Sequence, residues 1–239
     1  MHGCQLEYLG RVEIDVDLAA KQHRNYERSL AHLGVRVISL EPIPELPDSV
    51  FVEDPAVLLD EVAVITRMGA DARRGESESL ATALAQFRPL QWMSAPATLE
   101  GGDVMRIGRT LYVGISRRTN FEGAEQLASF SYRVVPVEVR GSMHLKTACT
   151  SLGGGRVLAN REWIDVSSLS ECEILDVPGG EPWAANVLRV GNTVLVPAAH
   201  PRTAGLLERK GLQVRTVDIS ELAKAEAGLT CMSLLFDAT

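Results

Sequence analysis

The feature that most constrains this chain is a short unit of two strands joined by a tight turn, which recurs five times. The copies span residues 51–65, 100–113, 147–158, 184–196 and 229–236. A polar or sulfur-bearing residue opens the first strand of each copy: Asp54, Asp103, Cys149, Asn186 and Cys231. Their spacing of roughly 37 to 49 residues is typical of a ring or array of repeated supersecondary units. A ring would bring the five strand starts together around one axis, where an active site can be assembled.

Helical patterns and further strands fill the intervals between the copies. We predict helices from Asp15 or Asp17 to Leu33 and over Ser77–Phe87, a helix opened by a capping box at Thr119–Glu122, and helices at Thr203–Lys210 and Ser220–Ala225. The predicted additional strands are Val35–Leu40, Val134–Val139 and Val214–Val217. Tight turns within the units argue against a doubly wound parallel sheet. We therefore expect one compact α/β domain over residues 1–239, built of small mixed sheets around an axis.

Composition excludes several classes of function. The net charge of −7 disfavours nucleic acid as a partner. No apolar run reaches the length of about 20 residues that crosses a bilayer. No signal peptide is visible, so we expect a cytoplasmic protein without a membrane partner. The four cysteines form no CxxC pair, so we expect neither a disulfide nor a metal site.

Cys231 is the first candidate for chemistry. It follows a glycine-containing loop, Gly228-Leu229-Thr230, at the start of the last predicted strand. A free cysteine is most often a small buried apolar residue. At a strand start in a ring of units, however, it can also be presented as a nucleophile. The choice depends on its partners.

His144 is the second candidate, because it lies just before the third unit's first strand and so near the same axis. A lone histidine is more often structural or solvated. A cysteine and a histidine from separate segments are nevertheless the minimal apparatus for covalent catalysis, with the histidine carrying the proton. A free thiol has a pKa of about 8.5, so the site must activate it, and a cationic substrate could do so.

Acidic residues gather in the first two units: Asp48, Glu53, Asp54, Glu100 and Asp103. One or two would ordinarily be turn or capping residues. Several carboxylates at strand starts suit a planar cation, because guanidinium donors match carboxylate acceptors in a forked geometry. The pairs Arg73-Arg74 and Arg117-Arg118 are candidates for binding an anionic end group, or are solvated surface. No GxSxG, P-loop or GxGxxG motif is present.

Six motifs in this order resemble the dimethylarginine dimethylaminohydrolase family. They are Pro47–Asp54, Thr66–Ala70, Leu99–Val104, Val113–Asn120, His144–Lys146 and Leu229–Cys231. The resemblance runs from about Asp15 to Phe236. It implies the pentein fold, a five-bladed α/β propeller of ββαβ-type repeats. It also implies hydrolysis of Nω-methylated arginines to citrulline and dimethylamine or methylamine, without a cofactor.

The resemblance also implies a role for each matching residue. Cys231 would attack the guanidinium carbon and form a covalent thiouronium intermediate. His144 would protonate the departing amine and then activate water, supported by Glu100. The expected substrate-binding residues are Asp48, Glu53 and Asp54 in the pocket, Arg73 and Arg118 on the α-carboxylate, and the backbone carbonyl of Ala225 on the α-amino group.

The sequence departs from the family pattern in two places. The family begins with a strand that leads into a mobile lid loop, whereas this chain starts inside that loop at about Met1–Leu6, so we expect the first blade to lack its N-terminal strand. The second departure is Glu226-Ala227-Gly228, where many relatives carry Asp and Gly. This change is expected to alter lid packing or substrate choice.

Other functions stay open at this level. A related enzyme could act on arginine, citrulline or another small guanidino or ureido compound. A non-catalytic pentein binding module would not need Cys231, His144 and Glu100 together. An enzyme disabled by the missing first strand is a third alternative. A homodimer is one possible assembly.

Overall fold

The structure is a computed structural model that describes residues 3–237. The helices of the described chain are α1 Val16–His32, α2 Ser77–Leu84, α3 Phe121–Ala128, α4 Leu145–Ala148, α5 Pro201–Arg209 and α6 Ser220–Ala223. Its strands are β1 Ala56–Leu58, β2 Ala63–Ile65, β3 Leu90–Trp92, β4 Val104–Ile107, β5 Thr110–Ile115, β6 Arg133–Glu138, β7 Cys149–Gly153, β8 Arg156–Ala159, β9 Glu173–Asp176, β10 Leu188–Val190, β11 Thr193–Pro197 and β12 Gln213–Val217. Four 3₁₀ turns complete the description: η1 Asp71–Glu76, η2 Gly101–Asp103, η3 Val166–Leu169 and η4 Thr230–Met232.

Four units of the sequence repeat form three-stranded sheets with one common topology. In each unit the first two strands pair as an antiparallel hairpin, and the third strand returns parallel to the second. In the sheet β4-β5-β6, for example, Val104 lies opposite Val113, and Thr110 opposite Arg133. The parallel return needs a crossover, which is a helix in three units and the turn η3 in the other.

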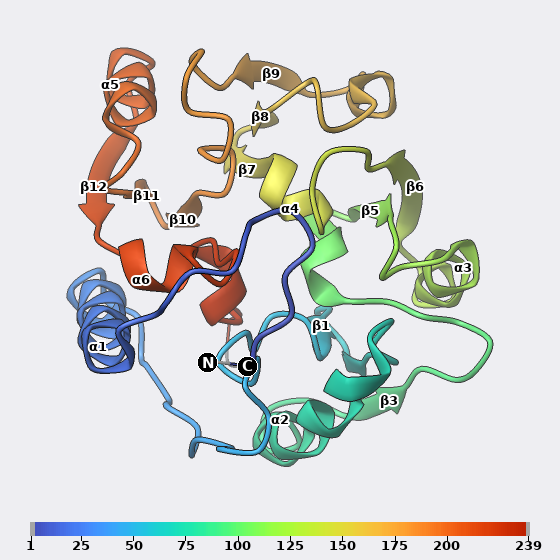
Figure 1. Ribbon diagram of the computed structural model, residues 1–239. Helices are drawn as coiled ribbons and strands as arrows, with labels where there is room; N and C mark the ends of the chain where they lie inside the picture. The colour runs from blue at the N-terminus through green and yellow to red at the C-terminus, as the bar shows by residue number, and fades with distance from the viewer. Residues whose placement is uncertain (1–2, 238–239) are drawn as a thin grey trace.

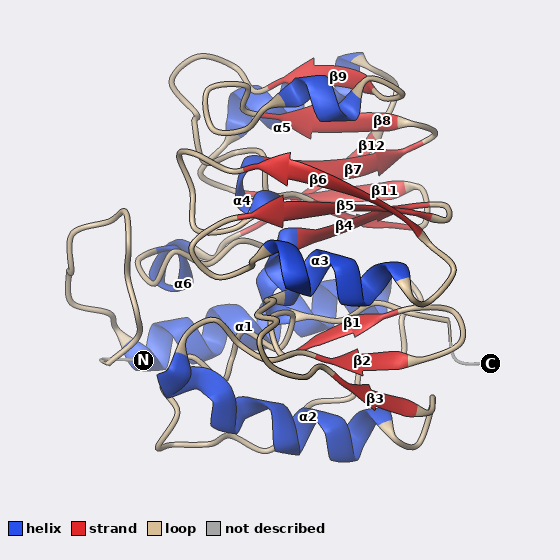
Figure 2. Ribbon diagram, turned by 90° about the vertical axis from the view of Figure 1, so that its right-hand side faces the viewer, coloured by secondary structure: helices blue, strands red, loops and turns tan. Residues whose placement is uncertain are grey.

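The units follow one another around a central axis (Figure 1). Seen from the side, the strands run across the ring, and the loop before α1 lies at the same end of the ring as α4 and α6 (Figure 2). This arrangement confirms the predicted α/β ring of ββαβ repeats. It also brings the starts of the first strands to one end of the molecule.

The core follows from the position of each strand in its sheet. The middle strands β2 and β11 are buried along their whole length, whereas the outer strands β6 and β9 are partly exposed. A middle strand packs against helices on one side and neighbouring units on the other, so it reads as a continuous apolar run. The buried apolar residues divide into five clusters around the ring.

The predicted helices are confirmed, with small shifts at their ends. Asp15 caps α1 by accepting the N–H of Leu18 at 2.9 Å, and Gly34 follows the helix with a φ of +86°. The N-cap of α3 is Asn120, which accepts the N–H of Gly123 at 2.9 Å. The capping box was therefore predicted one residue too early.

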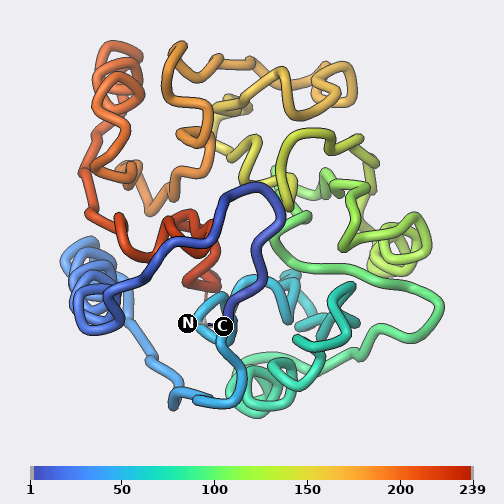
Figure 3. The backbone as a smooth tube through the Cα atoms, viewed as in Figure 1, coloured from blue at the N-terminus to red at the C-terminus, as the bar shows by residue number. Residues whose placement is uncertain are grey.

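The fifth sector of the ring has no sheet among the described residues, so two predicted strands are wrong. Val35–Leu40 and the segment after η4 run without strand pairing, and the tube in Figure 3 traces the first of these along the rim after α1. Among the described residues, no strand lies between these two segments to form backbone hydrogen bonds with both of them. A cavity of about 1110 Å³ lies there, lined by α1, α2, residues 34–43 and residues 232–237. Within residues 3–237 this sector therefore has no sheet, and the segment of Cys231 is a 3₁₀ turn.

Candidate active site

The nine predicted site residues are all largely buried. Glu100 precedes η2, His144 precedes α4, and Cys231 lies within η4. Arg73 lies in η1, and the others lie in connecting segments. The large cavity of the fifth sector is lined by none of the nine. The site is therefore distinct from that cavity.

Backbone and side-chain bonds fix the segment of Cys231. The N–H of Glu53 donates to the Cys231 carbonyl at 3.2 Å, and the N–H of Gly228 approaches the thiol Sγ at 3.3 Å. Thr230 donates its hydroxyl to Glu53 at 2.8 Å and its N–H to Asn186 at 3.0 Å. A Cβ on Gly228 would lie 2.1 Å from the Asn186 side chain, so this position requires glycine. The cysteine is held against an acidic residue of the first unit.

The surroundings of the Cys231 thiol oppose its ionisation. Burial, followed by the negative charges of Glu53 and Asp54, raises the pKa of Cys231 to about 12. A further positive charge beside these carboxylates would lower the pKa of the thiol and favour the thiolate. This dependence favours a cationic ligand as the partner of the thiol.

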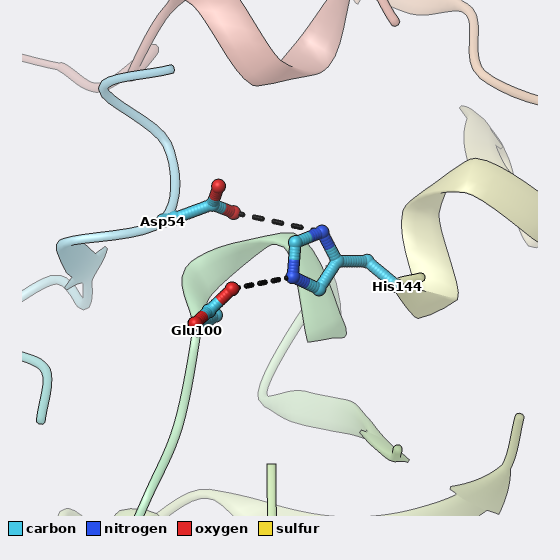
Figure 4. A group of neighbouring side chains, drawn as sticks. All are labelled: Asp54, Glu100 and His144. Atoms are coloured by element: carbon cyan, nitrogen blue, oxygen red, sulfur yellow. Dashed lines mark hydrogen bonds and ion pairs between the residues drawn. The ribbon is translucent and has the colours of Figure 1, made fainter. Parts of the chain in front are cut away.

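His144 lies between two carboxylates that come from different units (Figure 4). Its Nε2 is 2.8 Å from Glu100 Oε2, and its Nδ1 is 3.8 Å from Asp54 Oδ1. A Cβ on Gly102 would lie 2.7 Å from both Asp54 Oδ1 and His144 Nδ1. Only glycine leaves room for the imidazole to enter between the two acids.

The carboxylates keep His144 charged at neutral pH. Burial alone would lower its pKa, but the charge of Asp54, the hydrogen bond to Glu100 and the charge of Asp103 raise the pKa of His144 to about 9. Burial likewise opposes ionisation of Glu100, yet the bond and charge of His144, with two nearby arginines, lower the pKa of Glu100 to about 2. The pair is thus an imidazolium and a carboxylate. An imidazolium is a proton donor.

Asp54, Glu100 and His144 also have the residue types of a metal site, with potential ligand atoms within 4.8 Å of one another. Two observations disfavour that use. The imidazole must be neutral to bind a metal, and its raised pKa opposes this. The guanidinium of Arg73 already lies 2.8 Å from Asp54 and 3.8 Å from Glu100, so a cation already balances the acids.

Arg73 is committed to the interior of this network. It bonds Asp54 through Nη1 at 2.8 Å and Glu76 through Nε and Nη2 at 3.0 and 2.8 Å. Burial opposes the charge, but Asp54 and Glu76 raise the pKa of Arg73 above its usual range. All three guanidinium nitrogens have partners, since Nη2 also reaches the Asp48 carbonyl at 3.4 Å. Its contact with a substrate carboxylate stays a prediction.

Arg118 faces the N-terminal loop. Its Nε lies 2.7 Å from Glu7 Oε1, and its Nη1 lies 3.4 Å from Glu100 Oε1. Burial opposes the charge, but Glu100 and Glu7 raise the pKa of Arg118. Asp48 faces the same loop and accepts the N–H of Gln5 at 3.1 Å. Arg118 and Asp48 therefore contact the N-terminal loop through the same guanidinium and carboxylate groups that would bind a ligand.

Ala225 is buried in the core after α6, next to Glu226. Its N–H donates to the Leu222 carbonyl, and the predicted use of its own carbonyl stays a prediction.

Sequence reasoning missed several residues that complete the site. Lys146 lies 2.5 Å from Glu53, although its only sequence signal was its place in the His144 motif. Glu76 holds Arg73 although nothing in the sequence marks it, and Asn186 holds the Cys231 segment although the repeat pattern marked only its place at a strand start. Glu7 had no signal, because its partner Arg118 is 111 residues away.

Comparison with known proteins identifies the family. A family profile described as N,N dimethylarginine dimethylhydrolase, eukaryotic, matches residues 9–171. An N(G),N(G)-dimethylarginine dimethylaminohydrolase of Pseudomonas aeruginosa is 38% identical over 98% of this chain and 94% of its own length. The Streptomyces coelicolor protein of the same name is 40% identical over 95% of this chain and 89% of its own. This chain belongs to the dimethylarginine dimethylaminohydrolase family.

Solved structures agree with this assignment. The Pseudomonas aeruginosa dimethylarginine dimethylaminohydrolase, as a cysteine-to-serine mutant complexed with citrulline, superposes with a TM-score of 0.91 and 36% identity. The match covers 98% of this chain and 93% of the other. The chain is thus a hydrolase of the pentein fold. In its described part, no helix combines the length and apolar character needed to span a membrane.

Proposed function

We propose that this protein hydrolyses Nω-methylated arginines to L-citrulline and dimethylamine or methylamine. The observation that carries the proposal is that the thiol and the charged imidazole share an acidic neighbour: Asp54 lies 3.8 Å from His144 Nδ1, and burial with the charges of Glu53 and Asp54 raises the pKa of Cys231 to about 12. A bound cation would offset the negative charges that oppose ionisation of the thiol. The dimethylarginine dimethylaminohydrolases to which the chain is similar supply the substrate class.

The first step is binding of the guanidinium group beside Glu53 and Asp54. A planar cation with several N–H donors satisfies carboxylates that otherwise repel the thiolate. Its charge lowers the pKa of Cys231, and the thiol proton is released to solvent. The substrate thereby activates the nucleophile that attacks it.

The second step breaks the carbon–nitrogen bond. The Cys231 sulfur attacks the guanidinium carbon, and the His144 imidazolium donates its proton to the methylated nitrogen. The amine departs, which leaves a covalent thiouronium on sulfur. Glu100, hydrogen-bonded to His144, holds the ring in place and stabilises its charged form.

The third step releases citrulline. His144, now neutral, takes a proton from a water molecule that attacks the thiouronium carbon. The carbon–sulfur bond then breaks, a carbonyl forms, and the remaining hydroxyl proton returns to sulfur. The cycle needs only the thiol, the imidazole and the acids, so we propose no cofactor.

The remaining site residues hold the amino-acid end of the substrate in this proposal. Arg118 binds the α-carboxylate, with Arg73 supporting that region, while Asp48 and the Ala225 carbonyl bind the α-amino group. Residues 1–239 act as one catalytic domain, because the contributing segments come from around the ring.

We further propose a cytoplasmic location and leave a homodimer as the assembly to be tested. The four free cysteines fit a reducing compartment. Size-exclusion chromatography with light scattering tests the dimer.

The function is tested by citrulline formation from asymmetric dimethylarginine, monomethylarginine and arginine, with Cys231→Ala as the blank. Turnover of both methylated substrates well above arginine supports the proposal. Preference for arginine would move the protein to a deiminase-like activity. Absence of citrulline from all three would overturn the proposal.

A further inference from the structure

A strap of residues 3–13 crosses the end of the ring that holds the site. It contains no helix or strand, and it arches past α4 and α6 before α1 begins (Figures 1 and 2). Most of its residues from Glu7 onward are partly or fully exposed. Cys4 anchors its start in the core, with Leu6 packed against the same cluster, whereas the part from Glu7 onward is positioned by a few specific bonds.

The side chain of Glu226 binds the backbone of the strap. Its Oε1 accepts the N–H groups of Glu7, Tyr8 and Leu9 at 2.9, 2.7 and 2.8 Å. Three successive N–H groups converging on one oxygen form an anion-binding nest. Glu226 has a φ of +60°, which is uncommon for a residue other than glycine. This backbone is stable only because the surrounding bonds offset its strain.

The nest fixes Glu7 with its side chain on Arg118. Glu7 Oε1 lies 2.7 Å from Arg118 Nε, so a carboxylate of the chain itself already contacts this guanidinium. Glu7 Oε2 is buried and has no hydrogen-bond partner among the described residues. A carboxylate with one buried, unpaired oxygen is only partly satisfied. Glu7 therefore holds Arg118 with one good bond rather than two.

We propose that Glu7 is an internal competitor for the carboxylate site of Arg118. The inference rests on the proposed function, in which Arg118 binds the substrate's α-carboxylate. A free α-carboxylate can pair with a guanidinium through two parallel bonds, which is stronger than the single bond of Glu7. Exchange replaces one carboxylate by another, so the charge balance between Arg118 and Glu100 is unchanged. The strap stays on Glu226 while the Glu7 side chain moves out.

This competition acts only on ligands that carry a carboxylate. A ligand with an α-carboxylate displaces Glu7 and gains the stronger pair with Arg118. A guanidino compound without a carboxylate leaves Glu7 in place and gains nothing there. Glu7 thus weakens the affinity for true substrates and has no effect on carboxylate-free compounds.

The test compares Glu7→Gln with Glu13→Gln on the Cys231→Ala background, by calorimetric titration. Glutamine keeps the shape of Glu7 and removes its charge. Glu13 lies in the same strap and is exposed, so its variant controls for the loss of one negative charge. The ligands are asymmetric dimethylarginine and its decarboxylated counterpart, dimethylagmatine. KM and kcat of the same variants with Cys231 intact provide the second readout.

We expect Glu7→Gln to tighten asymmetric dimethylarginine binding about five- to tenfold, to lower KM equally and to leave kcat unchanged. Dimethylagmatine should bind both forms alike, and Glu13→Gln should change neither affinity. An unchanged or weaker affinity for dimethylarginine would overturn the inference and leave the proposed function intact if citrulline is still formed. If no form binds dimethylarginine or forms citrulline, both the proposed function and the inference fail.

Discussion

Two regions at the same end of the ring are built in opposite ways. The inner network of Asp54, Arg73, Glu76, Glu100 and His144 joins buried side chains from separate units by short ion pairs. The strap is largely exposed and held through its backbone by single carboxylates. The first region must keep its charges and geometry during the reaction. The second can exchange a contact for a ligand. The difference separates residues that perform chemistry from those that admit the substrate.

The largest expected effect is on the stability of the inner network. Arg73→Met removes the cation that pairs with buried Asp54 and Glu76. We expect the free energy of unfolding to fall by about 3 to 5 kcal/mol, because uncompensated buried charges are costly. Arg140→Met, which breaks a solvent-exposed pair with Glu138, should leave the urea midpoint nearly unchanged. Urea unfolding measures both, and equal losses would refute the contrast.

The next effect compares one substitution in the two regions. Gly102→Ala places a Cβ 2.7 Å from His144 Nδ1, so the imidazole must move. We expect citrulline formation to fall by about 100-fold, the usual scale for displacing a catalytic group by about 1 Å. Gly10→Ala in the strap meets no atom within 4 Å and should retain activity. Near-normal rates for Gly102→Ala would show that the position of the His144 imidazole is not critical.

A smaller effect should appear in the pH dependence of stability. The folded pKa of His144 is raised from 6.5 to about 9, so its contribution is complete below pH 6.5 and lost as the pH rises through 9. The pKa of Glu100 is lowered from 4.5 to about 2, so its contribution is complete above pH 4.5 and lost as the pH falls through 2. Wild type should therefore lose stability relative to His144→Gln between pH 6.5 and 9.5. Urea unfolding measures the stability difference between wild type and His144→Gln at pH 6.5 and at pH 9.5. The same difference at both pH values would contradict a charged imidazole.

The smallest effect on global stability is expected in the strap. Glu226→Ala removes the shared acceptor of three N–H groups, but those groups can bind water when the strap opens. We expect a change below about 1 kcal/mol in unfolding free energy. Tryptic cleavage after Arg11 should accelerate about tenfold, because local opening becomes easier. Glu226→Gln keeps an acceptor oxygen, so its cleavage should be faster than that of wild type and slower than that of Glu226→Ala. Unchanged cleavage in both variants would show that other contacts hold the strap.

The sequence predicts well those features that depend on neighbouring residues. The hairpin units, the cap at Asp15 and the turn at Gly34 follow from local patterns, and the structure contains them. The predicted strands at Val35–Leu40 and after Cys231 failed for the opposite reason. A strand exists only when a partner supplies its hydrogen bonds, and the propensity of the segment does not contain that information.

The candidate site divides in the same way. Cys231, His144 and Glu100 were recognisable from their motifs, and the structure brings His144 and Glu100 into contact. The pairing of Arg118 with Glu7 could not be predicted, because many acidic residues are available and only the folded strap selects one. Glu226 was marked by its departure from the family pattern, but its contact with the strap needed the structure.

The central claim is that Cys231 becomes covalently attached to the guanidinium carbon during turnover. The direct measurement is mass spectrometry of enzyme quenched with acid while it converts asymmetric dimethylarginine, followed by peptide mapping. The account predicts a thiouronium adduct on the peptide that contains Cys231, none on Cys4, Cys149 or Cys172, and no adduct or citrulline with Cys231→Ala. Citrulline formation by Cys231→Ala, or an adduct on another cysteine, would contradict it.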